Sequence, residues 1–427
     1  MNRAFLLLTG VVLLPSCTMA PAYEPKSASD LGVPDQWSVP AAPERADLTR
    51  WWQSFDDPVL GQLVEQAAQS NLDLAQALAR LRQAREALVI SRAGLLPSAN
   101  ASAGYNRTEP IRGGETTQTL PDGSIVTIGS SGRDSVSLGL DASYQLDLFG
   151  GVRSSVEASR AQYEGAGFDY ATVLLSVQSE VARNYVLARA YQAQIENAQA
   201  NLAIQDDNLE IAGFRVQAGL VSSLDAEQAR ASRAQTAASL PQIEQQYNAA
   251  VSRIGVLTGQ APGALKDMLA APRPIPQGPE DIAAGIPADV LRQRPAELFP
   301  ALSIGGSLSA SAASIGNVLD TITGSLFARL SQLIFDGGRT SAQIRSAQAG
   351  AEGAFAGYRL TVLNALEDVE NALVALRTAG ERERQFAIAL DAASTSALLA
   401  RDQYRTGLTD FTTLNAQEAS LISARNG

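Results

Sequence analysis

The sequence predicts a mainly α-helical protein with a small β part, organised around two long helices. Apolar residues recur at spacings of three and four through residues 153–213 and again through 339–405. Each stretch follows short segments in which apolar residues alternate with small or polar ones. A helix of about 60 residues is roughly 90 Å long, far more than the width of a compact domain. Such a helix cannot bury its apolar stripe within a compact monomer.

The apolar stripe of the first stretch is interrupted by Asn184 and Gln205, and that of the second by Glu383. The first stripe consists of Tyr163, Ala166, Tyr170, Leu174, Val177, Val181, Asn184, Ala188, Tyr191, Ile195, Ala198, Leu202, Gln205 and Leu209. The second consists of Phe355, Tyr358, Val362, Ala365, Val369, Ala372, Leu376, Ala379, Glu383, Phe386, Leu390, Ala393, Ala397, Ala400 and Tyr404. Their many small residues favour close packing among several helices over a two-stranded coiled coil. A solvated coiled coil is the alternative interpretation.

The two stretches are related by an internal duplication. A constant shift of 188 residues places Tyr170 on Tyr358 and the Gly-Leu pair at 219–220 on the pair at 407–408. Self-similarity of this kind indicates a repeat architecture. We therefore assign residues 51–285 to a first repeat and residues 286–427 to a second.

Composition excludes several classes of site. The chain has 427 residues, a net charge of −11, no histidine, one cysteine, and lysine only at Lys26 and Lys266. Zinc sites of the Cys/His type, Cys-His nucleophiles and Ser-His-Asp triads are therefore excluded. The acidic balance argues against nucleic acid as a partner. A carboxylate pair is formally possible, but the acidic residues follow helical surface patterns, so we expect neither an enzyme nor a cofactor.

The first residues have the pattern of an export signal. Arg3 precedes an apolar stretch at 4–14 that is too short to span a bilayer as a mature helix. The one cysteine, Cys17, follows shortly after it. We predict a signal peptide over residues 1–16, lipid attachment at Cys17 and an extended tether over residues 17–50. An incidental buried cysteine is the alternative for Cys17.

Each repeat contains two segments with the alternation of β-strands. They cover residues 99–107 and 135–146 in the first repeat and 302–310 and 325–334 in the second. A helix over residues 71–95 precedes the first pair and ends at Pro97. Two strands are too few for a stable sheet, and exposed sheet edges do not occur in a bilayer. We therefore predict a transmembrane barrel closed by several subunits, with a small soluble sheet as the alternative.

Six blocks of the sequence resemble outer-membrane factors of the TolC/OprM type, most of all their lipid-anchored branch. The blocks are WWQSFDDPVLGQLVEQA at 51–67, NLDLAQALARLRQA at 71–84, YQLDLFGGVR at 144–153, SEVARNYV at 179–186, GIPADVLRQRP at 285–295 and LFPALSIGG at 298–306. The resemblance implies a homotrimer in the outer membrane of a Gram-negative bacterium. Four strands per protomer would contribute to a transmembrane β-barrel in contact with outer-membrane lipid, above a long helical barrel in the periplasm. A periplasmic adaptor protein and an inner-membrane transporter of the resistance-nodulation-division (RND) class would be the partners.

The resemblance also implies functional positions at two turns. The periplasmic tips of the family match Gly219, Leu220, Val221 and Ser222 in the first repeat and Gly407, Leu408, Thr409 and Asp410 in the second. Glycine after a helix permits a left-handed residue and a tight reversal, so we expect adaptor docking there; a plain helix stop is the alternative. Candidates for the periplasmic aperture are Asp225, Tyr404 and Asn415, the last at a position where the family usually has aspartate.

The second repeat departs from the family pattern. No half-length helix like that at 71–95 precedes the Leu-Phe-Pro at 298–300, and the last helix stops at Gly427. The leading interpretation of the whole chain is a passive exit duct for drugs or other small molecules across the outer membrane. The alternatives are a non-conducting outer-membrane lipoprotein and the exit duct of a type I secretion system.

Overall fold

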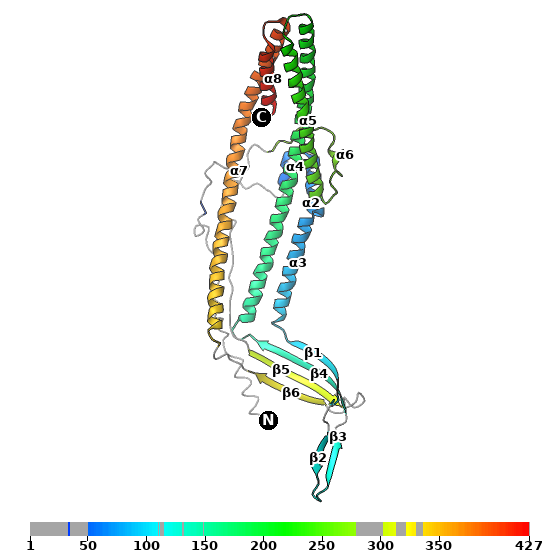
Figure 1. Ribbon diagram of the computed structural model, residues 1–427. Coiled ribbons are helices and arrows are strands. Elements are labelled where there is room, and N and C mark those ends of the chain that lie inside the picture. The colour runs from blue at the N-terminus through cyan, green and yellow to red at the C-terminus, as the bar shows by residue number, and fades with distance from the viewer. Residues whose placement is uncertain are drawn as a thin grey trace. The chain divides into compact units, whose positions relative to one another are not determined.

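The structure is a computed structural model that describes residues 33–34, 50–109, 111, 115–129, 132–147, 149–278, 302–312, 322–329 and 336–426 (Figure 1). It has two compact units. Among the described residues, the sheet unit takes its members from 82–165 and 302–356, and the helical unit from 33–81, 166–278 and 357–426. Each unit takes segments from both sequence repeats, so the repeats are not themselves the compact units.

Two helices of nearly equal length dominate the described chain. Helix α4 spans Gly151–Gln217 with 67 residues, and α7 spans Arg339–Thr406 with 68. Both long helices predicted from the sequence are thereby confirmed. Each is followed by a turn and a return helix, α5 at Ser223–Leu257 and α8 at Phe411–Asn426. Among the described residues, no helix combines the length and the apolar character that crossing a membrane requires.

The helical segment before the first strand is interrupted. A short 3-10 helix, η3 (Trp51–Phe55), leads into α2 (Pro58–Ser70) and then α3 (Leu72–Ala93). Asp57 caps α2 by accepting hydrogen bonds from the backbone N–H groups of residues 59 and 60. Asn71 separates the two helices: its Oδ1 accepts from Leu74 N at 2.9 Å, and its Nδ2 donates to Leu257 O at 2.9 Å. The end of α5 therefore sets where α3 begins.

The main sheet has four antiparallel strands in the order β1-β4-β5-β6. Their bounds are Ser98–Thr108, Arg133–Leu146, Leu302–Ala312 and Ile322–Arg329. Each of the four predicted strands is present, although residues 330–334 of the fourth lie outside the described residues. Strands β1 and β6 are the two ends of the sheet, and β4 and β5, one from each repeat, pair in its centre.

A separate β-hairpin lies between β1 and β4, in a stretch for which the sequence predicts no strand. Strand β2 (Glu115–Thr119) pairs with β3 (Ile125–Gly129). The turn between them places Gly123 at φ 85°, and Asp122 Oδ1 accepts a hydrogen bond from Ser124 N at 3.0 Å. A glycine in this position avoids the steric cost of a left-handed backbone.

The helical unit has two principal hydrophobic cores. The larger lies among η3, α2, α4 and α5, and includes Leu60, Leu63, Val181, Tyr185, Val251 and Ile254. The second, which we call the tip cluster, joins the ends of α4, α5, α7 and α8; it consists of Ala212, Ala229, Ala400, Tyr404, Phe411 and Leu414. The tip cluster therefore packs two helical hairpins, one from each repeat, into a single bundle.

Several predictions lie outside the described residues. They are the signal peptide at 1–16, the lipidated Cys17, most of the tether at 17–50, and the missing helix of the second repeat, which falls within 279–301. One described piece of the tether, Val33, packs against Val362 on α7.

Candidate functional site

The turns that end α4 and α7 have the same backbone geometry. Gly219 lies at φ 70°, with its N–H bonded to Val216 O at 3.0 Å, and Leu220 N donates to Arg215 O at 2.9 Å. In the second turn Gly407 lies at φ 78°, with its N–H bonded to Tyr404 O at 3.1 Å, and Leu408 N donates to Gln403 O at 2.7 Å. This pair of bonds defines the Schellman motif. The predicted positive φ at both glycines is confirmed.

The return helices begin with different caps. Ser222 Oγ accepts a hydrogen bond from Leu224 N at 3.2 Å at the start of α5. Asp410 Oδ1 accepts one from Thr413 N at 2.8 Å at the start of α8. The backbone N–H of Thr413 stabilises the carboxylate and lowers the pKa of Asp410. One tip is thus capped by a neutral hydroxyl and the other by a charge.

Leucine side chains project from both turns. Leu220 is 70% exposed and Leu408 is 80% exposed, whereas Val221 and Thr409 beside them are partly buried. An exposed leucine costs solvation free energy that a partner could recover by covering it. The predicted tip residues are therefore presented at the ends of the hairpins.

Arg215 crosses from the first hairpin to the second. Its Nη1 donates to Tyr404 O at 2.6 Å, and its guanidinium carbon lies 4.7 Å from the centre of the Tyr404 ring. The ring itself is buried in the tip cluster, edge-on to Phe411 at 5.8 Å between centroids. Sequence reasoning assigned no role to Arg215.

The three aperture candidates lie in different surroundings. Tyr404 is only 1% exposed, and burial raises its pKa, with the nearby Asp225 adding to the rise and Arg215 opposing it. Asn415 is partly buried and accepts a hydrogen bond from Ser232 Oγ at 3.0 Å. Asp225 lies near enough to Tyr404 to interact with it electrostatically. In the single chain, however, the Tyr404 ring is buried in the tip cluster and is not exposed at an opening.

The sheet has two chemically different faces. On one, the register pairs Ala99 with Ala142, Ala101 with Leu140, Ala103 with Leu138 and Tyr105 with Val136; on the other, it pairs Ser98 with Ser143, Asn100 with Asp141, Ser102 with Gly139 and Gly104 with Ser137. Tyr144 shares the apolar face, eight residues along β4 from Val136. From Val136 to Tyr144 the face spans nine residues, within the range of about 9–11 residues that a tilted strand needs to cross a bilayer.

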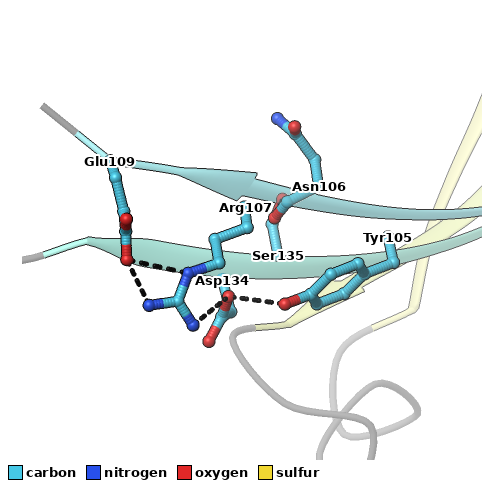
Figure 2. Close-up of polar contacts among 6 residues, drawn as sticks. All are labelled: Tyr105, Asn106, Arg107, Glu109, Asp134 and Ser135. Carbon is cyan, nitrogen blue, oxygen red and sulfur yellow. Dashed lines mark hydrogen bonds and ion pairs between the residues drawn. The ribbon is translucent and has the colours of Figure 1, made fainter. Parts of the chain in front are cut away.

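Charged residues end this apolar face beyond Tyr105 (Figure 2). The Tyr105 hydroxyl donates to Asp134 Oδ1 at 2.8 Å, and Arg107 Nη1 lies 3.7 Å from the same oxygen. Arg107 Nε also donates to Glu109 Oε1 at 2.9 Å. A tyrosine followed by charges is the sequence of side chains expected where an apolar band meets water.

Comparison with known proteins accounts for this combination of long helices and a small sheet. The family model described as "Outer membrane efflux protein" matches residues 63–260 and 289–427. The chain belongs to the outer membrane efflux protein family. Membership confirms the resemblance to outer-membrane factors of the TolC/OprM type and the mainly helical fold. This member of the family is therefore an outer-membrane efflux component of a Gram-negative bacterium and not an enzyme.

Relatives match this efflux family member over nearly their whole length. The pyoverdine export outer membrane protein OpmQ of Pseudomonas putida is 30% identical, covering 97% of this chain and 92% of the relative. Nodulation protein T of Rhizobium leguminosarum bv. trifolii is 28% identical, covering 96% and 90%. The structure of the outer-membrane channel OprN matches with a TM-score of 0.81 and 30% identity, covering 96% of this chain and 94% of OprN.

A buried polar network in the helical unit was missed by sequence reasoning. Arg189 is 1% exposed; its Nη1 donates to Gln192 Oε1 at 2.6 Å and to Ala271 O at 2.9 Å. Its guanidinium lies over the ring of Tyr185, whose hydroxyl donates to Asp57 Oδ2 at 2.6 Å. Burial and this bond raise the pKa of Tyr185. The spacing of residues 185, 189 and 192 places them on one helical face, which is the signal that could have revealed the network.

The described residues offer no site for a metal. They contain no group of three or more Cys, Asp or Glu side chains close enough together to hold an ion. The polar networks instead bind helices to one another, to the last residue of α6 (Lys266–Leu269) and to the two residues after it.

Proposed function

We propose that this chain is one of three identical subunits of a passive exit duct for drugs or other small molecules. A periplasmic adaptor and an inner-membrane transporter of the RND class would supply the substrates and the energy. The observation that carries the proposal is the two-faced sheet with β1 and β6 at its ends.

A sheet with one apolar and one polar face suits a barrel wall between lipid and water. Its end strands leave unpaired backbone groups, which are costly in a bilayer unless a neighbouring strand covers them. Pairing β1 of one copy with β6 of the next would close the ring. The face that carries Ala101, Leu138 and Leu140 would then meet lipid, and the face that carries Asn100, Ser102 and Asp141 would line the water-filled lumen.

Exposed apolar side chains on α7 also support the assembly of several copies. In the described chain, α7 exposes Phe355 (43%), which belongs to the predicted apolar stripe, and also Leu360 (58%) and Leu363 (44%). Large apolar side chains that a single copy leaves exposed are what a neighbouring copy would cover. Neighbouring copies would bury them in a helical barrel.

The tips would dock the adaptor. The surface consists of Gly219, Leu220, Val221, Ser222, Gly407, Leu408, Thr409 and Asp410. A Cβ added at Gly219 would meet nothing within 4 Å, so this turn leaves room for a partner helix, and the exposed leucines at 220 and 408 offer it apolar contact. We assign Asp225 and Asn415, with Tyr404 behind them, to the region where the duct narrows.

The function is tested by conductance and by complementation. Purified trimers should conduct ions in planar bilayers, and the gene should restore drug resistance to a strain that has a matching pump but lacks its exit duct. Silent bilayers and failed complementation by a stable outer-membrane trimer would instead support a non-conducting lipoprotein. Export of a protein substrate without drug resistance would support a type I secretion duct.

Lipid attachment at Cys17 has its own test. Replacing Cys17→Ser should abolish labelling with palmitate, because the sulfur is the proposed acceptor and no second cysteine exists. A Thr18→Ser variant is the matched control and should label like the wild type. Labelling that persists in Cys17→Ser would contradict the assignment.

The shortened second repeat predicts a fragile trimer. One missing helix per subunit would forgo several kcal/mol of apolar burial at about 25 cal/mol per Å², comparable with the stability margin of a domain. Inserting a family-like helix of about 22 residues between Pro295 and Ala296 should raise the temperature at which the trimer dissociates on semi-native gels. A parent trimer that is already heat-resistant and fully active would refute this expectation.

A further inference from the structure

We propose that Val33, in the tether, straps the chain to helix α7 and covers an apolar stripe that the shortened second repeat leaves without a partner helix. We call Tyr358, Val362 and Leu366 the strap seat. Val33 and Val362 form one buried cluster, with exposed fractions of 9% and 2%, and Tyr358 and Leu366 pack against it. All four belong to the helical unit. The strap goes beyond the proposed function and rests on it only where the lipid anchor enters.

The strap seat differs from the rest of the first part of α7. From Arg339 to Ala392 the helix is described throughout, and Val362 is its one buried residue. Positions 358, 362 and 366 are four residues apart and so form one row along the helix. Among the described residues, Val33 is the one member of this cluster that α7 does not itself supply. The burial of Val362 therefore depends on the tether.

The equivalent stripe of the first repeat lies beside a helix. The shift of 188 residues places the strap seat on three partly or fully buried residues, Tyr170, Leu174 and Gln178. Helix α3 runs beside α4, with Ser91 Oγ 3.3 Å from Ser155 Oγ. Because the two helices run in opposite directions with the same rise, Leu74 near the start of α3 lies at about the level of residue 172. Helix α3 therefore passes the first stripe.

The second repeat has the strap where the first has α3. Its sequence contains no half-length helix before the Leu-Phe-Pro at 298–300, and Val33 packs on the stripe that such a helix would pass. Pro34 follows Val33, and a residue before proline avoids the helical conformation and favours an extended one. Pro34 itself is exposed. A single apolar residue on an extended chain suits a seat that is one row of side chains wide.

The position of the strap leaves enough chain for the lipid anchor. The 16 residues from Cys17 to Val33 span at most about 55 Å when extended. The 23 residues from Val362 back to the start of α7 at Arg339 rise about 35 Å. A lipid on Cys17, as proposed above, can therefore reach past the start of α7 while Val33 stays on its seat.

Cross-linking within the full chain tests the strap directly. Val33→Cys combined with Leu366→Cys should be joined by a short bismaleimide, giving a linked peptide in mass spectrometry and no dimer on a denaturing gel. The control pair combines Val33→Cys with Leu360→Cys, since Leu360 is 58% exposed and lies on the opposite side of the helix from Val362. It should link about tenfold less, and the single-cysteine variants report any link to Cys17. Equal linking of both pairs, or links only between copies, would overturn the strap.

A charge at the strap gives a second test. Burial of one valine is worth about a tenfold change in an equilibrium, so Val33→Asp should speed maleimide labelling of a Val362→Cys chain by about tenfold. Pro34→Asp is the matched control, because it places the same charge at the neighbouring exposed position, and it should leave the labelling rate unchanged. An unchanged rate in Val33→Asp would overturn the strap.

The helix insertion between Pro295 and Ala296 tests whether strap and helix share one stripe. It should lower linking between positions 33 and 366 by about tenfold. Undiminished linking beside an inserted helix that resists hydrogen exchange would overturn the claim that the strap takes that helix's place. None of these measurements needs a conducting channel. A linked strap in a silent trimer would uphold the strap and count against the proposed duct, and a conducting trimer without the link would do the reverse.

Discussion

The α4–α5 and α7–α8 hairpins reverse direction with the same hydrogen bonds, but they differ in the residues that each long helix buries in the turns of helix before it ends. We call this buried face of each helix its seam. The seam on α4 contains three buried polar residues, Asn201, Gln205 and Asn208. Within the described part of the chain, neither Asn201 Oδ1 nor Gln205 Oε1 has a hydrogen-bond partner. The corresponding part of α7 buries Ala393, Ala397 and Ala400 instead.

The second hairpin has a different polar contact. Glu418 on α8 is 2% exposed and binds Arg401 on α7 through both carboxylate oxygens, one of them at 2.8 Å from Nη2. This bond raises the pKa of Arg401. The comparison shows that a turn is determined by a few local residues, whereas each seam depends on the particular side chains that meet across it.

The largest expected effect comes from breaking the ion pair of the second hairpin. Glu418→Ala should destabilise the α7–α8 hairpin by about 3 kcal/mol, because it leaves Arg401 partly buried without its counter-charge. Hydrogen exchange along α8 would measure the loss. Glu227→Ala, which removes an exposed carboxylate on α5, should have little effect. Equal effects of the two variants would show that the buried pair contributes nothing.

The turns should respond alike to a smaller perturbation. Gly219→Ala and Gly407→Ala should each cost about 1 kcal/mol, because a side chain strains a positive φ, and both should impair adaptor cross-linking while leaving the trimer intact. Gly380→Ala is the control: it lies within α7 with open space around it and should stabilise the helix by up to about 1 kcal/mol. Wild-type docking by both turn variants would refute the assignment of the tips.

The polar seam of the first hairpin should tolerate an apolar residue. Asn201→Leu should be neutral or stabilise the protein by about 1 kcal/mol, since a polar residue at a seam position costs stability. The thermal midpoint of the trimer would measure it, with Ala198→Leu as a control for overpacking. A destabilisation of Asn201→Leu as large as that of Ala198→Leu would mean that Asn201 makes contacts essential to the assembled seam.

The smallest effect concerns the caps and their pH dependence. The lowered pKa of Asp410 means that its contribution to stability is complete above about pH 4, the usual aspartate value, and is lost as the pH falls through the lowered pKa. Exchange at Thr413 N–H should therefore lose protection in acid, whereas exchange at Leu224 N–H, capped by Ser222, should not. Asp410→Ser should remove the difference between the tips.

Much of the fold could be predicted because its signals are local. The two long helices, the four main strands and both glycine turns follow from periodicity and from glycine placement. The β2–β3 hairpin was missed because β2 (ETTQT) is polar throughout and β3 (IVTIG) is only five residues long, so neither shows a clear alternation. The helix predicted over residues 71–95 begins within one residue of α3, but the hydrogen bond from Asn71 to Leu257, which is 186 residues away, could not be predicted from local signals.

The candidate site was predicted less completely, for a related reason. The tip residues were found from the turn pattern, but Arg215 and Arg189 look like ordinary helical arginines in the sequence. Each acquires its role only when a distant backbone carbonyl, Tyr404 O or Ala271 O, lies beside it. The assignment of Asp225, Tyr404 and Asn415 to the aperture stays a prediction, and the burial of the Tyr404 ring could not be foreseen.

The order of strands in the sheet has a consequence for folding. Strands β1 and β4 form one hairpin within the first repeat, and β5 and β6 form another within the second. Their junction pairs Leu146 with Leu302, which are 156 residues apart in the chain. Closing so long a loop costs more entropy and is slower than closing a hairpin, so β4–β5 pairing should be the last step within a subunit. Until β4 and β5 pair, the two hairpins have four open edges between them, and the chain must be protected from pairing with other copies in the wrong order.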